Sequence, residues 1–193
     1  MDIKELIVKQ YRWDAGMVRH MLGVLTDDLS DDELNWQTHP GHHSIWHHIW
    51  HMFLSNDYYS AGALRVPAVW EVGNWRERLD LSTMARAFDY PGNAMDFVVP
   101  RFAIVDVPDS LVDELKAIRL QSYFAYVDDL LAKTTARIAE ATEEQLLEKV
   151  PWYDRHRPAY ERVASFSHVY RHIGMMEDMR GLIRGPGAGT ASI

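Results

Sequence analysis

The chain has 193 residues, with 20 Lys and Arg against 28 Asp and Glu, which gives a formal net charge of −8 when His is neutral. It has no Cys and ten His, and this excludes disulfide scaffolds, Cys-ligated zinc, iron–sulfur clusters and thiol nucleophiles on the protein itself. The acidic balance and the lack of a Lys and Arg cluster argue against nucleic-acid binding. The sequence contains no run of about 18 apolar residues, the length that would predict a membrane span.

Helical periodicity begins at the N-terminus, where apolar residues recur at steps of three and four and predict a helix over residues 3–29. This segment carries charges where a signal peptide would have an apolar stretch, so we expect a cytoplasmic protein. Residues 30–33 then predict a cap followed by a short polar turn. Ser44 suits the N-cap of a second helix that runs to about Tyr59.

Residues 61–109 interrupt this pattern, because Pro and Gly break every period and aromatic residues are scattered among them. Within this insertion the sequence predicts one short helix over residues 82–88. A connection of this length is either a functional lid or a structural excursion that packs through its aromatic side chains. The sequence supports both interpretations.

Helical periodicity returns over residues 110–141. A polar segment follows as far as Pro158, and a last helix is predicted from about Tyr160 to Ile183, ended by Gly185. Four long helices, little strand signal and no internal repeat predict an all-α fold, an antiparallel four-helix bundle. We expect one domain over residues 1–184 and a flexible tail at 185–193.

Two histidines on the last predicted helix, His168 and His172, stand four residues apart. This spacing places both imidazoles on one helical face, one turn apart, as in many metal sites. If that face is buried, the two rings need either a metal ion or other hydrogen-bond partners. A helical wheel places Tyr170 and Glu177 on the opposite face and so predicts that the pair faces the interior. The apolar residues that share the face of the pair are Ala164, Met175, Met179, Leu182 and Ile183.

Six more histidines lie between residues 39 and 51. On the second predicted helix, His47, His48 and His51 share a sector opposite an apolar stripe. They form either the solvated face of an amphipathic helix or the wall of a wet cavity between helices. Wheel geometry alone favours the solvated face.

Several segments resemble the DinB/YfiT-like family in order and type: LTDDLSDDELNWQ at the end of the first helix, SIWHHIWHMFLSNDYY, ATEEQLLEKV and SHVYRHIGMMEDMRGLI. In that family a Ser-led second helix carries a metal-binding His seven residues after the Ser, which corresponds here to Ser44 and His51. The last helix of the family carries His-x-x-x-His-x-Gly, matched by His168 and His172 before Gly174. The Gln that usually follows this Gly is Met175 in this chain.

The resemblance implies a four-helix bundle that holds a divalent ion on His51, His168 and His172. Zinc or nickel is the expected metal, with iron or manganese as alternatives. Three His ligands leave a position free for water or substrate, as in catalytic sites, and the ion would acidify a water or thiol bound there.

Members of the family act on small molecules as transferases or isomerases that use low-molecular-weight thiols, and hydrolysis is a related reaction. The resemblance therefore implies an enzyme whose sulfur nucleophile arrives with a co-substrate, since the chain has no Cys. Three carboxylates are candidate bases or orienting groups by position, Asp57, Glu161 and Asp14. Each also fits a solvated carboxylate with no such role.

Two other functions fit the sequence. A non-catalytic metal-binding or stress-response protein is suggested by histidines beyond those that a three-ligand site requires: His39, His42, His43, His47 and His48. A homodimer without metal is suggested by seven Trp residues, with Trp36, Trp46 and Trp50 as candidate interface residues. The number of ions bound per chain separates metal storage from catalysis.

Overall fold

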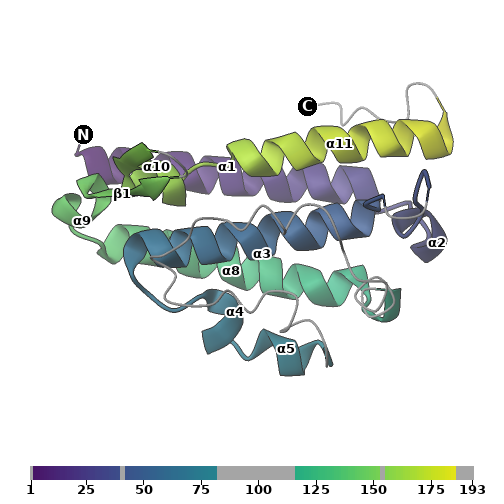
Figure 1. Cartoon of the computed structure of the whole chain (residues 1–193), viewed down its shortest axis with the longest axis horizontal. Coiled ribbons are helices and arrows are strands. Elements are labelled where there is room, and N and C mark those ends of the chain that lie inside the picture. The colour runs from purple at the N-terminus through teal and green to yellow at the C-terminus, as the bar shows by residue number, and fades with distance from the viewer. Residues whose placement is uncertain (1, 40–41, 82–115, 153–154, 186–193) are drawn as a thin grey trace.

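The computed structural model describes residues 2–39, 42–81, 116–152 and 155–185. Four long helices lie side by side in it (Figure 1): α1 (Ile3–Thr26), α3 (Ile45–Leu64), α8 (Leu120–Glu140) and α11 (Ser167–Arg184). Five short helices join or flank them: α2 (Asp31–Leu34), α4 (Val69–Val72), α5 (Trp75–Arg78), α9 (Glu143–Leu147) and α10 (Ala159–Val163). Within the described ranges, the strands β1 (Lys149–Trp152) and β2 (Arg155–Pro158) make one small antiparallel hairpin. The predicted all-α class is confirmed.

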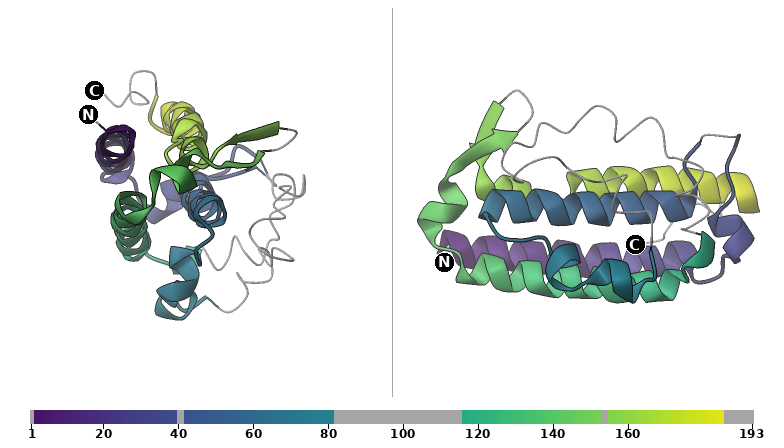
Figure 2. Two further views of the ribbon diagram at one scale, coloured as in Figure 1. Left: turned by 90° about the vertical axis from the view of Figure 1, so that its left-hand side faces the viewer. Right: turned by 60° about the horizontal axis from the view of Figure 1, so that its bottom comes forward.

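The four long helices form a closed ring of contacts, seen end-on in Figure 2, in which α1 and α3 each pack against both α8 and α11. Tyr123 donates a hydrogen bond to the carbonyl of Trp50, and Tyr126 donates to Asp57, so residue numbers rise together along α3 and α8. These two helices therefore run parallel, as do α1 and α11, whereas α1–α8 and α3–α11 run antiparallel (Figure 1). The antiparallel arrangement expected from the sequence holds for two contacts of the ring, because α8 starts at the end of the molecule where α3 starts.

The core lies between the four long helices and is rich in large aromatic side chains. Trp46 is 1% exposed and Trp50 is 0% exposed, so the prediction that these residues form a dimer interface is wrong. Both lie on α3, which packs against α4, α8, α10 and α11, and their large side chains fill the core. Trp36 keeps 38% of its surface exposed.

Local capping explains where the elements begin. The Ser44 hydroxyl accepts the backbone N–H of His47 at 3.1 Å and starts α3 as predicted. This helix continues to Leu64, beyond the expected end, and stops where Arg65 adopts a left-handed conformation with φ of 55°. The short helices α4 and α5 follow, and the predicted helix and lid beyond residue 81 lie outside the described residues.

The last predicted helix is broken into α10 and α11, with residues 164–166 between them. The break places His168 and His172 in the first two turns of α11. The hairpin before α10 escaped sequence reasoning because Pro151 and Pro158 are typical of loops, yet both sit in paired strands. No helix in the described ranges combines the length and the apolar character needed to cross a bilayer.

Candidate metal centre

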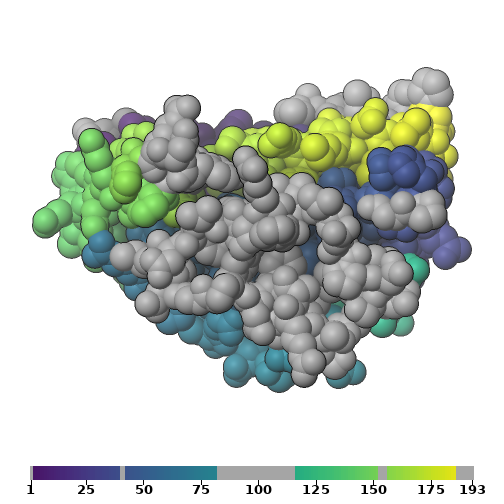
Figure 3. Space-filling view, in the orientation of Figure 1, coloured from purple at the N-terminus to yellow at the C-terminus, as the bar shows by residue number. Residues whose placement is uncertain are grey.

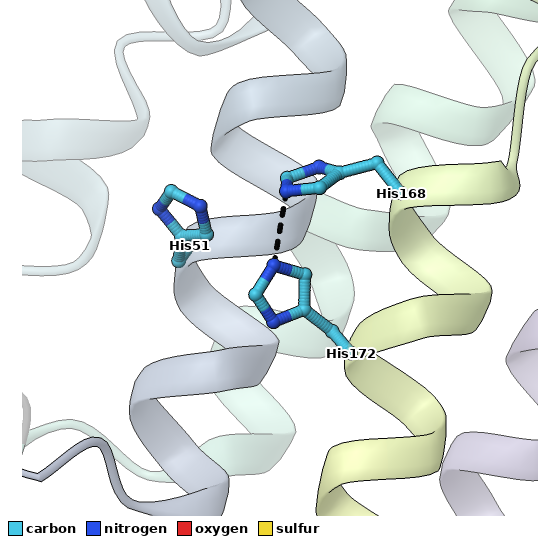
Figure 4. Close-up of side chains that lie close together, drawn as sticks. All are labelled: His51, His168 and His172. Carbon is cyan, nitrogen blue, oxygen red and sulfur yellow. Dashed lines mark hydrogen bonds between the residues drawn. The ribbon is translucent and has the colours of Figure 1, made fainter. Parts of the chain in front are cut away.

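Three histidines from two helices meet where α3 packs against α11 (Figure 4). His51, His168 and His172 each offer one ring nitrogen, and these nitrogens lie within 4.8 Å of one another. The Nε2 atoms of His168 and His172 are 2.9 Å apart. The ring centroid of His51 lies 5.4 Å from that of His168 and 5.1 Å from that of His172. The structure thus brings together the three residues that the resemblance implied as ligands, while their binding of a metal stays a prediction.

The pair on α11 lies at one edge of the buried face of that helix. His172 is 8% exposed and His168 is half-buried, whereas Met175 is 42% exposed and Leu182 is 61% exposed. The predicted apolar surroundings are therefore partly wrong. The wheel centred the buried face on the histidines, but its centre lies on neighbouring residues of α11, namely Val169, Ile173, Met176 and Met179.

The solvated-face interpretation of the second helix is wrong, because His47, His48 and His51 are 4%, 7% and 9% exposed. The rings of His47 and His51 stack, with centroids 6.1 Å apart and an angle of 9° between the planes. His43 contacts His47 at 4.1 Å between centroids. His48 joins the cluster directly, since its Nδ1 lies 2.8 Å from Nδ1 of His172.

By contrast, His39 and His42 lie in the exposed loop before α3 and contact Thr38. The histidine-rich segment therefore divides at the start of α3 into an exposed and a buried group.

Burial also controls the charge of the cluster. Desolvation, helped by the neighbouring imidazoles, lowers the pKa of His51 to about 3 and that of His172 to about 2. The pKa of His168 is also lowered by burial and then by Arg171. The three rings are therefore neutral at pH 7, the form in which imidazole binds a metal.

The donor set fits a transition-metal ion. Nδ1 of His51 and Nδ1 of His168 are buried and have no hydrogen-bond partner among the residues that the structure describes. A buried ring nitrogen without a partner is costly, and neutral imidazoles are good ligands for zinc, nickel, iron and copper. The cluster therefore has the ligand number and the chemistry of an open three-histidine site.

The candidate carboxylates lie elsewhere. Asp57 is fully buried and accepts the N–H groups of Val69 at 2.8 Å and Trp70 at 2.7 Å, and the hydroxyl of Tyr126 at 3.0 Å. It thus holds the start of α4 against α3 and α8, and the α4–α5 segment lies on the opposite side of the molecule from α11 (Figure 3). Burial raises the pKa of Asp57, although these hydrogen bonds oppose the change. Its contacts are those of a structural carboxylate.

Asp14 and Glu161 also bind side chains outside the histidine cluster. Asp14 accepts hydrogen bonds from Gln10 and from the hydroxyl of Tyr170, each at 2.8 Å. Glu161 pairs with Arg157 at 2.9 Å and lines a pocket between α1 and α10. None of these hydrogen bonds reaches the histidine cluster, so the contacts of the three carboxylates give no support to a role as base or orienting group.

Sequence reasoning missed one residue of the centre, His48. The signal was the spacing of three between His48 and His51, which places both on the part of α3 that meets α11. The spacing does not predict that His48 belongs to the centre unless it is known that α3 packs against α11.

Comparison with known proteins agrees with the motifs. A family model described as the DinB superfamily matches residues 16–176. The matched range includes all of α3 and the first half of α11, and with them the three clustered histidines. A comparison with curated proteins found no match.

Proposed function

Because this chain belongs to the DinB superfamily, we propose that it is a metal-dependent enzyme acting on a small molecule. Its divalent ion, zinc or nickel, is held by His51, His168 and His172. The observation that carries the proposal is the convergence of three neutral ring nitrogens within 4.8 Å at the α3–α11 contact. The ion would acidify a water or thiol at the position that three ligands leave free.

The surrounding residues support this role by excluding water from the cluster. His47 stacks on His51 and, with α3 and α11, keeps bulk water away from the ring. The resulting desolvation keeps the ligands free of protons well below neutral pH. Because the chain has no Cys, a thiol reaction needs a low-molecular-weight thiol as co-substrate.

Metal analysis tests the first half of the proposal. The full chain, purified without a His-tag and offered zinc, nickel, manganese or iron, should retain one equivalent of metal by mass spectrometry. His51→Ala should lose it, and His20→Ala, which removes an exposed histidine of α1, should keep it. Less than about a tenth of an equivalent of every metal in the wild type, or unchanged retention in His51→Ala, would refute the site.

Thiol consumption tests the second half. The metal-loaded protein is mixed with low-molecular-weight thiols and small electrophiles, and loss of free thiol is followed. Catalysis that disappears in His51→Ala and persists in His20→Ala supports a thiol transferase. Metal binding without turnover of any thiol or hydrolysis of any ester tried would favour a non-catalytic protein.

A non-catalytic metal-binding protein is the second candidate. The observation that favours it is His47, both of whose ring nitrogens are buried and have no hydrogen-bond partner in the described part of the chain. More than one tightly bound ion per chain, with loss of the extra ion in His47→Ala, would support storage.

The predicted homodimer also stays a proposal. Two large exposed apolar side chains of α1, Leu6 at 49% and Trp13 at 60%, are available for it on the described surface. Light scattering on wild type and Trp13→Ser tests it, and a monomeric wild type would refute it.

A further inference from the structure

Three imidazoles form a continuous hydrogen-bonded chain across the α3–α11 contact. Nε2 of His168 lies 2.9 Å from Nε2 of His172. Nδ1 of His172, on the other side of the same ring, lies 2.8 Å from Nδ1 of His48. A neutral imidazole has one N–H and one lone pair, so the chain can run in only two directions.

The environment of His168 decides between the two directions. If His48 donates to His172 and His172 donates to His168, the proton of His168 must sit on Nδ1. That nitrogen is buried and has no hydrogen-bond partner among the described residues, so this direction leaves an orphaned N–H. If His168 donates from Nε2 instead, its Nδ1 carries only a lone pair, which is less costly to bury unpaired than an N–H.

The favoured direction therefore runs from His168 through His172 to His48. It places the proton of His172 on Nδ1, where His48 accepts it, and leaves a lone pair on Nε2 of His172. This nitrogen faces the cluster and contacts His168. Binding of a metal through Nε2 of His172 then requires no proton shift at His172.

We propose that His48 is a positioning residue for the metal centre, which accepts the Nδ1–H of His172 and so presents the Nε2 lone pair of His172 to the ion. The proposal rests on the proposed metal site. Residues that accept the second N–H of a histidine ligand fix its tautomer and ring orientation, and their loss typically weakens metal binding. His48 is not itself placed as a ligand, because its Nδ1 is directed at the ring edge of His172 that faces away from His168.

Two substitutions of nearly equal shape separate hydrogen bonding from packing. His48→Asn keeps an acceptor, since its Oδ1 can take the place of Nδ1, and His48→Leu removes it. Zinc affinity is measured on the full chain by competition with a chromophoric chelator, with His20→Leu as the control. We expect His48→Leu to bind zinc about 10- to 100-fold more weakly, with His48→Asn and His20→Leu close to wild type.

An unchanged affinity in His48→Leu would overturn the proposal, and so would an equal loss in His48→Asn and His48→Leu. Circular dichroism of each metal-free variant shows whether it folds.

A measurement on the metal-free wild type keeps the proposal testable whether or not the variants fold. Long-range ¹H–¹⁵N correlation spectra identify which nitrogen of His172 carries the proton. Protonation at Nδ1 is expected, and protonation at Nε2 would overturn the proposal. If the wild type binds no zinc, the proposed function fails, whereas these spectra still decide the tautomer.

Discussion

Acid should unfold the metal-free protein at an unusually mild pH. Four buried histidines at and beside the α3–α11 contact have pKa values lowered mainly by desolvation, to about 2 for His47 and His172, about 3 for His51 and about 4 for His48. In the unfolded chain each returns to about 6.5. The unfolded state therefore takes up protons that the folded state refuses, and stability is lost as the pH falls below about 6.5.

The size of the effect follows from the same values. Between pH 7 and pH 5.5, an unfolded histidine gains about 1.2 kcal/mol from protonation that its folded form does not. Four such residues together give an upper value on the order of 5 kcal/mol, which is comparable with the whole stability of many domains. Above pH 7 this contribution is fully present, so the stability should level off there.

Urea unfolding of metal-free protein, followed by circular dichroism at pH 7.5 and pH 5.5, measures the loss. The double variant His47→Leu/His48→Leu should lose about half as much between the two pH values, because two of the four groups are gone. His20→Leu serves as the control and should behave as wild type. An equal loss in wild type and double variant, or no loss in the wild type, would refute the reasoning that burial holds these rings neutral.

Three further outcomes are expected. Asp57→Ala should destabilise the protein by about 3 to 5 kcal/mol, because two backbone N–H groups and the Tyr126 hydroxyl lose their acceptor; if it instead alters zinc affinity and leaves urea unfolding unchanged, Asp57 belongs to the centre. Zinc at about 100 times its Kd should stabilise the wild type by about 2.7 kcal/mol, seen as a rise in Tm. His172→Ala should abolish that rise, and its persistence would place the ion elsewhere. Met175→Gln should leave zinc affinity unchanged, because this side chain is 42% exposed and lies beyond the edge of the buried face; tighter binding would show that the family residue reaches the ion.

Sequence patterns were sufficient where a local rule decides the structure. The Ser44 cap depends on one hydroxyl and a backbone N–H three residues later, and the pairing of His168 with His172 depends only on helical spacing. The contact of His51 with that pair was predicted only from the family resemblance, because the periodicity of a helix does not show which other helix it packs against.

The remaining features depend on neighbours that a helical wheel does not contain. His47 and His48 lie on the polar side of α3, which in isolation is typical of a solvated face. In the folded chain α3 contacts α4, α8, α10 and α11, so both of its sides are covered and polarity no longer predicts exposure. The parallel pairing of α3 with α8 likewise depends on where the chain crosses, which periodicity does not record.

The centre joins parts of the chain that are far apart in sequence, since His51 and His168 are separated by 168 − 51 = 117 positions. We expect contacts between such distant segments to form late in folding, because closing a long loop costs entropy before any contact forms. Interactions that are absent from the transition state change the unfolding rate and leave the folding rate almost unaltered. An ion bound between α3 and α11 would therefore lengthen the lifetime of the folded chain without helping it to fold.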